Sequence, residues 1–203
     1  MRTARCVVRR AVLFLTEAGK DRPMGLAIVE AAGLAVPVAD LKAYLRIDSG
    51  GEDMLLERLI RAATDLCERF IGQWLIVRAG EDVMPVRTGT WQRLDARPVV
   101  AIESVTGVPA EGAAFALAVD AYAIDIDRHG DGWVRVMEPG AAGRIRVRYR
   151  AGIADDAAAI PEGIRHGIVR MAAEMHGLRE GDAATPPAAV TALWRPWRRM
   201  RLA

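Results

Sequence analysis

Cysteine is scarce in this chain. The only two, Cys6 and Cys67, lie far apart in the sequence. Two cysteines can build neither a disulfide framework nor a zinc site with the usual ligand spacing, so we expect a protein of a reducing compartment. Long apolar runs are also missing, since none approaches the roughly 20 residues that span a bilayer. The fold must therefore depend on a hydrophobic core, and no membrane contact is expected.

The N-terminus lacks the features of a secretion signal. It has a basic start, but the apolar run from Ala11 to Leu15 is too short for the core of a signal peptide, and no convincing cleavage pattern follows. We interpret residues 1–24 as an arm that is disordered or ordered by a partner. Alternatively, the working start is Met24, and residues 1–23 are not in the mature protein.

Catalytic and metal-binding motifs are lacking too. Ser49 and Ser104 are the only serines, neither lies in a nucleophile elbow, and no phosphate-binding glycine motif is present. The run from Asp125 to Asp131 imitates a calcium loop, but its twelfth position is Val136 instead of the required Glu. We therefore expect no catalytic residue, no metal and no cofactor. An enzyme that uses Asp125, Asp127 and His129 ranks last among the possible functions.

What the chain does have is one long amphipathic helix, predicted over Glu52 to Ile71. Apolar residues recur at steps of three and four, which predicts one buried side. The expected stripe consists of Leu55, Leu59, Ala62, Leu66 and Phe70, widened by Leu56, Ile60, Ala63 and Cys67. Ser49 and Glu52 have the spacing of a capping box, and Gly72 is placed to end the helix.

Further elements follow from the same kind of pattern. Helices are predicted over 38–47 and, after Pro161, over 162–177. The segments 74–86, 91–94, 98–108, 122–127 and 133–137 are strand-like, and the last two flank a glycine-containing turn typical of a hairpin. In the strand 144–150, Ile145, Val147 and Tyr149 should face inward while four arginines face outward.

The order of these elements predicts an α+β fold: a small helical bundle with a β-rich insertion between the second and the last long helix, followed by an extended C-terminal tail. The expected segments are an N-terminal arm, a helical hairpin, the β-rich insertion, a C-terminal helix that completes the bundle, and a linker with a tail. Their bounds are 1–24, 25–72, 73–152, 153–181 and 182–203.

Charge is concentrated at the two ends of the chain. Residues 1–24 and 194–201 each carry a net charge of +4, so the rest of the chain carries −6 within a total of +2. A body of that sign is a poor surface for nucleic acid, whereas the basic ends suit an acidic partner. Tryptophan and arginine dominate the binding energy of many interfaces. The C-terminal tail is therefore the predicted partner-binding site, through Trp194, Arg195, Trp197, Arg198, Arg199 and Arg201.

Several segments, taken in order, resemble one family. They are LKAYLRID, ED..L..LI.AA...CE..IG, L.AR.PV..I.SV, V.YRAGI, IPEGI..GI..MAAE and ALWRPWRRMRL. Together they resemble the head-tail connector (adaptor) proteins of tailed phages and of phage-derived gene transfer agents. The resemblance covers approximately residues 36–202, nearly everything except the arm.

The resemblance implies a structural protein of a virion or phage-like particle, made in the bacterial cytoplasm and placed at the head-tail interface. Such a protein would dock on the portal protein as a ring, commonly of twelve copies. It would extend the DNA channel, through which DNA passes without sequence-specific binding, and would hold a tail-side connector or stopper protein. The C-terminal residues named above would reach into the portal.

Two other expectations remain open from the sequence. A small DNA-binding or regulatory protein would use the basic termini on phosphates, and its binding would fall steeply with salt. Under the connector interpretation, deletion of residues 188–203 should leave a folded protein that fails to join capsids.

Overall fold

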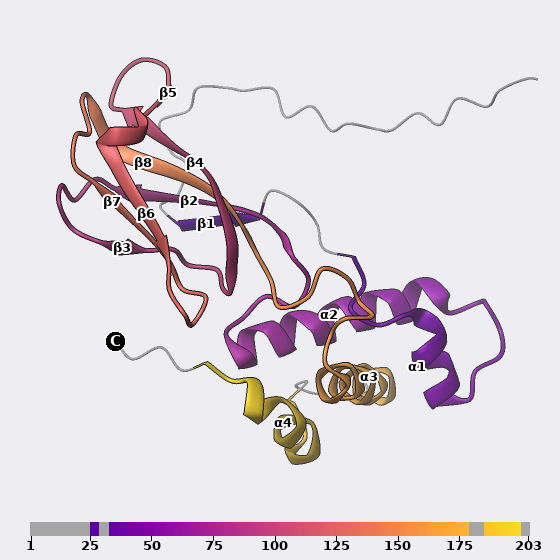
Figure 1. Cartoon of the computed structure of the whole chain (residues 1–203). Coiled ribbons are helices and arrows are strands. Elements are labelled where there is room, and N and C mark those ends of the chain that lie inside the picture. The colour runs from indigo at the N-terminus through magenta and orange to yellow at the C-terminus, as the bar shows by residue number, and fades with distance from the viewer. Residues whose placement is uncertain (1–24, 29–32, 179–184, 200–203) are drawn as a thin grey trace, which may run out of the picture.

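The computed structural model describes residues 25–28, 33–178 and 185–199. They form a helical bundle and a β unit that lie next to each other (Figure 1). The predicted α+β class is confirmed. The helices are α1 (Val38–Leu45), α2 (Asp53–Ile71), α3 (Glu162–Gly177) and α4 (Ala188–Trp194), with short 3-10 helices η1 (Val119–Ala121) and η2 (Arg195–Trp197). The strands are β1 (Gly25–Ile28), β2 (Arg78–Pro85), β3 (Gln92–Arg93), β4 (Val99–Pro109), β5 (Phe115–Ala116), β6 (Tyr122–Ile126), β7 (Gly132–Val136) and β8 (Ala142–Ala151).

Helix α2 ends as predicted but begins differently. Gly72 takes a left-handed conformation, with φ of 71°, and its N–H donates to the carbonyl of Glu68. The predicted capping box is wrong, because the residue at the N-terminal cap is Glu52 and its side chain makes no capping hydrogen bond. Instead, the Asp53 carboxylate in that first turn pairs with Lys42 at 2.8 Å.

The buried face of α2 is not centred on the predicted stripe but on the adjacent one, which begins one residue later in the sequence. Its centre is Leu56, Ile60, Ala63, Cys67 and Ile71, all fully buried. The expected Leu55 is 48 % exposed, Ala62 is exposed, and the other predicted stripe residues are only partly buried. Both stripes are apolar, so spacing alone could not choose between them. The position of α3 decides, because it packs on the side that carries Leu56.

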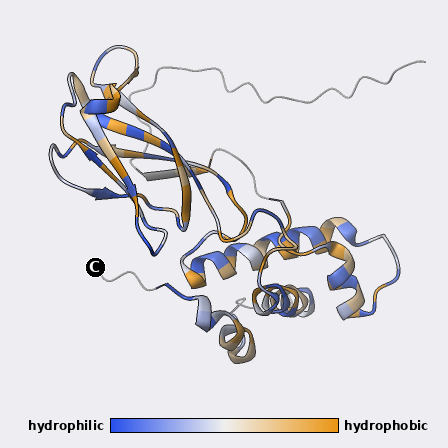
Figure 2. Ribbon diagram, viewed as in Figure 1, coloured by the Kyte–Doolittle hydropathy of each residue, from blue (hydrophilic) through white to orange (hydrophobic). Residues whose placement is uncertain are grey.

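The β unit contains two antiparallel sheets. The larger has the order β1-β2-β8-β4-β5 and the smaller has the order β3-β7-β6. Strand β8 lies between β2 and β4, and its predicted alternation is confirmed because Ile145, Val147 and Tyr149 are fully buried, while Arg148 and Arg150 are exposed. Figure 2 shows hydrophobic and hydrophilic residues alternating along the strands of the unit.

Two further features of the β unit bear on the sequence predictions. The hairpin predicted around the turn 128–132 is confirmed, since β6 and β7 pair with each other. The segment Gly25–Ile28 was grouped with the helical hairpin, but it pairs with β2 as the edge strand of the larger sheet. That sheet therefore begins before the helical bundle in the sequence.

The bundle and the β unit have separate cores that meet at a joint. Leu75 belongs to the helical core, whereas the adjacent Trp74 belongs to the β core. Across the joint, Arg78 forms a bidentate ion pair with Glu68, with distances of 2.9 and 2.7 Å, and its guanidinium lies 4.1 Å from the centre of the Trp74 ring. Both ion-pair side chains are nearly buried. The last turns of α2 are thus tied to the start of β2.

Candidate functional site

The C-terminal segment is folded rather than extended. Helix α4 packs on α3 and on the end of α2. Trp194 is fully buried, its Nε1 donates to the carbonyl of Ile164 at 3.4 Å, and its ring centre lies 5.9 Å from that of Phe70. Its ring touches Gly167, where a Cβ would collide with it. Trp194 is therefore a core residue of this chain, and the expectation that it is exposed for a partner is wrong.

The residues after α4 run across the C-terminal end of α2, and we call Arg195–Arg199 the C-terminal strap. The N–H of Arg199 donates to the carbonyl of Ile71 at 2.8 Å, and Gln73 Nε2 donates to the carbonyl of Trp197 at 2.6 Å. A side chain at Gly72 would press on the Arg199 carbonyl. The strap is therefore held by its backbone, which leaves its side chains free for other contacts.

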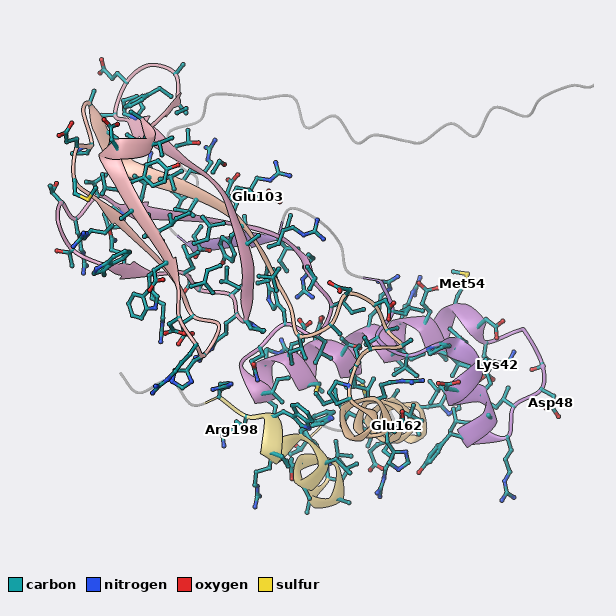
Figure 3. The ribbon with its side chains drawn as sticks, viewed as in Figure 1. Lys42, Asp48, Met54, Glu103, Glu162 and Arg198 are labelled. Atoms are coloured by element: carbon teal, nitrogen blue, oxygen red, sulfur yellow. The ribbon has the colours of Figure 1, made fainter. Side chains whose placement is uncertain are left out.

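Four of the six predicted partner-binding residues lie on the surface of the strap. Arg195, Arg198 and Arg199 are exposed, and Trp197 is 38 % exposed. Arg198 lies just past η2, with its guanidinium 5.3 Å from the Phe70 ring (Figure 3). Arg201 lies outside the described residues. The structure thus brings three arginines and one indole together on one short segment.

A hollow of about 630 Å³ lies where the strap, the end of α2 and the β unit meet. Arg97, from the β unit, extends into this junction. Its Nε donates to the carbonyl of Gly72 at 3.1 Å and its Nη1 lies 3.3 Å from Asp131. Nothing in the sequence marked Arg97 for this place, because the residues that it meets are 25 and 34 positions away.

The acidic hairpin between β6 and β7 uses its carboxylate for its own turn. Asp127 Oδ1 accepts the backbone N–H groups of His129 and Asp131, and Oδ2 accepts the Trp133 indole N–H at 3.3 Å. Burial alone would raise the pKa of Asp127, but these hydrogen bonds and the nearby His129 outweigh it, so its pKa is lowered. The oxygens that a cation would need are thus engaged in the hairpin. No group of three potential ligand side chains is found in the described part of the chain.

The two histidines of α3 have separate neighbours. His166 meets the ring of Tyr44 edge-on at 6.4 Å, and His176 Nε2 lies 3.0 Å from a carboxylate oxygen of Glu52. Each helps to hold α3 against the α1 and α2 side of the bundle.

Two buried groups have strongly shifted pKa values. Burial raises the pKa of the Cys67 thiol, and the charge of Glu68 raises it further. Burial and the charge of Asp82 likewise raise the pKa of Tyr149, whose hydroxyl donates to Asp82 Oδ1 and accepts the Ala96 N–H, both at 3.0 Å. Both groups stay protonated at neutral pH, which suits packing and hydrogen bonding.

No helix in the described ranges is long and apolar enough to cross a bilayer.

Several solved structures are similar to this chain. One is a chain from the neck of an empty gene transfer agent (GTA) particle computed with C6 symmetry, which is 28% identical with a TM-score of 0.73. The match covers 89% of this chain and 98% of that one. A chain from the neck of a native GTA particle computed with C12 symmetry is 27% identical, with a TM-score of 0.71 and coverage of 89% and 98%.

A third similar chain comes from the virion of a native gene transfer agent particle. It is 27% identical with a TM-score of 0.67, and the match covers 88% of this chain and 97% of that one. These matches extend over more of the sequence than either the helical bundle or the β unit contains, so both units and their arrangement are shared. No protein-family model and no curated protein matches the chain.

Proposed function

We propose that this chain is a structural component of the neck of a phage-like particle of the gene transfer agent type. The observation that carries the proposal is the similarity, at 27–28% identity and over nearly the whole length of both chains, to chains from GTA necks. The scarcity of catalytic motifs agrees with a structural role, as does the use of Asp127 and both histidines for internal contacts.

In this proposal several copies surround the channel through which DNA passes. The similar necks have C6 and C12 symmetry, which supports a cyclic arrangement, and we propose twelve copies. Cyclic assemblies are built by repeating one heterologous contact until the ring closes. The net negative charge of the body suits a wall along which DNA moves without adhering.

We further propose that the C-terminal strap is the contact to the portal protein, through Arg195, Trp197, Arg198 and Arg199, with Arg201 beyond the described residues. Exposed tryptophan and arginine supply much of the energy at protein interfaces. A ring presents the same strap many times, so a weak single contact becomes a stable attachment through effective concentration. The β unit would remain available to neighbouring copies or to a tail-side connector or stopper protein.

The test is a double substitution, Trp197→Ala with Arg198→Ala, in the full chain. Both side chains are exposed, so circular dichroism should report an unchanged fold. Co-sedimentation with portal-bearing heads should fall by about tenfold or more, since loss of one hot spot of ~2 kcal/mol suffices for that. Arg150→Ala, an exposed arginine of β8, is the matched control and should bind normally. Equal co-sedimentation of the double variant and the control would refute the docking role.

A further inference from the structure

The hollow beside the C-terminal strap has an excess of positive charge. Five arginines and three carboxylates line it, from α2, from the β unit and from the strap. The arginines are Arg69, Arg78, Arg97, Arg198 and Arg199, and the acids are Asp65, Glu68 and Asp95. Glu68 and Arg78 neutralise each other in the ion pair of the joint, and Arg97 pairs with Asp131. The excess positive charge of the lining therefore lies mainly on Arg69, Arg198 and Arg199.

Arg97 is the buried member of this set. Only 7% of its surface is exposed. Its Nε and Nη1 have partners within the chain, but Nη2 is buried and has no hydrogen-bond partner among the described residues. A buried charged donor without an acceptor is unfavourable, so such a group in a folded protein calls for a partner. An incoming oxygen anion would supply that partner.

Two arginines of the strap and two aromatic residues from other segments also line the hollow. Arg198 and Arg199 are exposed, and no carboxylate in the described part of the chain pairs with either. Phe70 and Trp74 also line the hollow. The site therefore combines guanidinium groups with aromatic surface, which is the chemistry that recognises an acidic side chain flanked by apolar ones.

We propose that this hollow binds a carboxylate side chain from an acidic segment of a partner polypeptide. The proposal deepens the docking role of the strap and rests on it, because the partner at this place would be the portal protein. The carboxylate accepts from Arg97 at the bottom of the hollow and from Arg198 or Arg199 at its edge. Arginine suits this role because its planar fork matches both oxygens of a carboxylate.

Duplex DNA fits the hollow less well. A phosphate on a duplex is part of a broad, dense row of negative charges, and Asp65 at the same hollow would repel that row. A single carboxylate on a narrow segment brings far less negative charge to the hollow than a duplex does. DNA is therefore an outcome of the test rather than the proposed ligand.

The experiment uses the full-length protein and the peptide acetyl-Gly-Leu-Glu-Glu-Leu-Gly-amide, followed by NMR of the arginine Nε–H groups. We expect the signals of Arg97, Arg198 and Arg199 to shift as the peptide is added, while that of Arg150 stays unchanged. The peptide with both glutamates replaced by glutamine should bind about tenfold more weakly or not at all, as expected when a charge-assisted hydrogen bond is lost.

Substitutions in the protein complete the test. Arg198→Gln together with Arg199→Gln changes only exposed side chains and should lower the affinity for the glutamate peptide by about tenfold. Arg150→Gln should leave that affinity unchanged. Three results would overturn the proposal: no shift with the glutamate peptide, equal binding of the glutamine peptide, or stronger shifts of the same arginines with a DNA duplex.

This result is separable from the docking role of the strap. If the peptide binds as expected but Trp197→Ala with Arg198→Ala still co-sediments with heads, the hollow is an acid-binding site and the portal contact lies elsewhere. If docking is lost but the peptide does not shift Arg97, the strap docks through its surface and the hollow plays no part.

Discussion

Gly167 is the residue that lets Trp194 lie against α3. Glycine inside a helix costs up to about 1 kcal/mol relative to alanine. Here the absence of a side chain makes room for the indole, whose Nε1 and Cδ1 occupy the space that a Cβ would need. The indole in turn covers the helical core, where it is the largest of the fully buried side chains.

We therefore expect Gly167→Ala to lower the free energy of unfolding by about 1–3 kcal/mol, the usual cost of overpacking, despite the better helix propensity of alanine. Gly177→Ala in the same helix is the matched control, because nothing lies within 4 Å of its added Cβ. That variant should be unchanged or slightly more stable. Urea unfolding measures both, and equal stability of the two would mean that Trp194 is not seated on α3.

At the scale of the element, α4 is part of the bundle. Its two inward residues, Val190 and Trp194, are one turn apart and almost fully buried. The expectation that residues 188–203 could be deleted from a folded protein therefore conflicts with the structure. The boundary between the compact body and the exposed C-terminal residues comes later in the chain, between Trp194 and Trp197.

The two tryptophans make this division measurable. We expect Trp194→Ala to cost about 3–5 kcal/mol of stability, as for other buried aromatic side chains. Trp197→Ala should cost less than about 1 kcal/mol, because its side chain is partly in solvent. Thermal or urea unfolding of the two variants gives the comparison. If the truncated protein 1–187 unfolds at the same urea concentration as the full chain, α4 is not part of the core.

The same elements indicate how far the sequence could lead. It predicted the long helices, the β hairpin and the alternation of β8, because each follows from local periodicity and from turn residues such as Gly72. It placed Leu55 rather than Leu56 on the buried face of α2. Two adjacent stripes of this helix are apolar, and only the packing of α3 determines which one is buried. Charge and aromatic content suggested an exposed tail, although the spacing of Val190 and Trp194 was already that of a buried helix face.

Contacts between segments that are far apart in the sequence could not be predicted from such local patterns. The four-residue strand β1 is too short to show a period, and its partner β2 lies more than fifty residues later in the sequence. The hollow beside the strap is made by Arg97, Gly72 and Arg199, which come from three distant segments. Only the folded chain brings them together, so the sequence could indicate the arginines of the strap but not the buried one beneath them.

At the scale of the whole molecule, two cores are joined by a narrow region of backbone. Strand β8 leaves the β unit at Gly152, whose N–H donates to the carbonyl of Pro98, and the chain then returns to the helical core through Ala154. Ala154 accepts the Val77 N–H at 2.8 Å and forms an isolated parallel bridge to Ile76. Together with the pair of Glu68 and Arg78, these bonds hold the bundle and the β unit in one orientation.

Gly152 is where this joint can be tested. A Cβ there would collide with the backbone of Val77 and Ile76, which cannot move aside as a flexible side chain could. We expect Gly152→Ala to lower stability by about 3 kcal/mol or more, at the upper end of overpacking costs. Gly143→Ala, at the other end of β8, has nothing within 4 Å of its added Cβ and should change stability by less than about 1 kcal/mol. Far-UV circular dichroism follows mainly the helices, whereas tryptophan fluorescence reports both units, through Trp74, Trp91 and Trp133 of the β unit and through Trp194 and Trp197 at the bundle. Urea transitions from the two probes should coincide in the Gly143 variant and separate in the Gly152 variant, because weakening the joint lets the two cores unfold independently. Coincident transitions at unchanged stability in the Gly152 variant would contradict the coupling of the two cores.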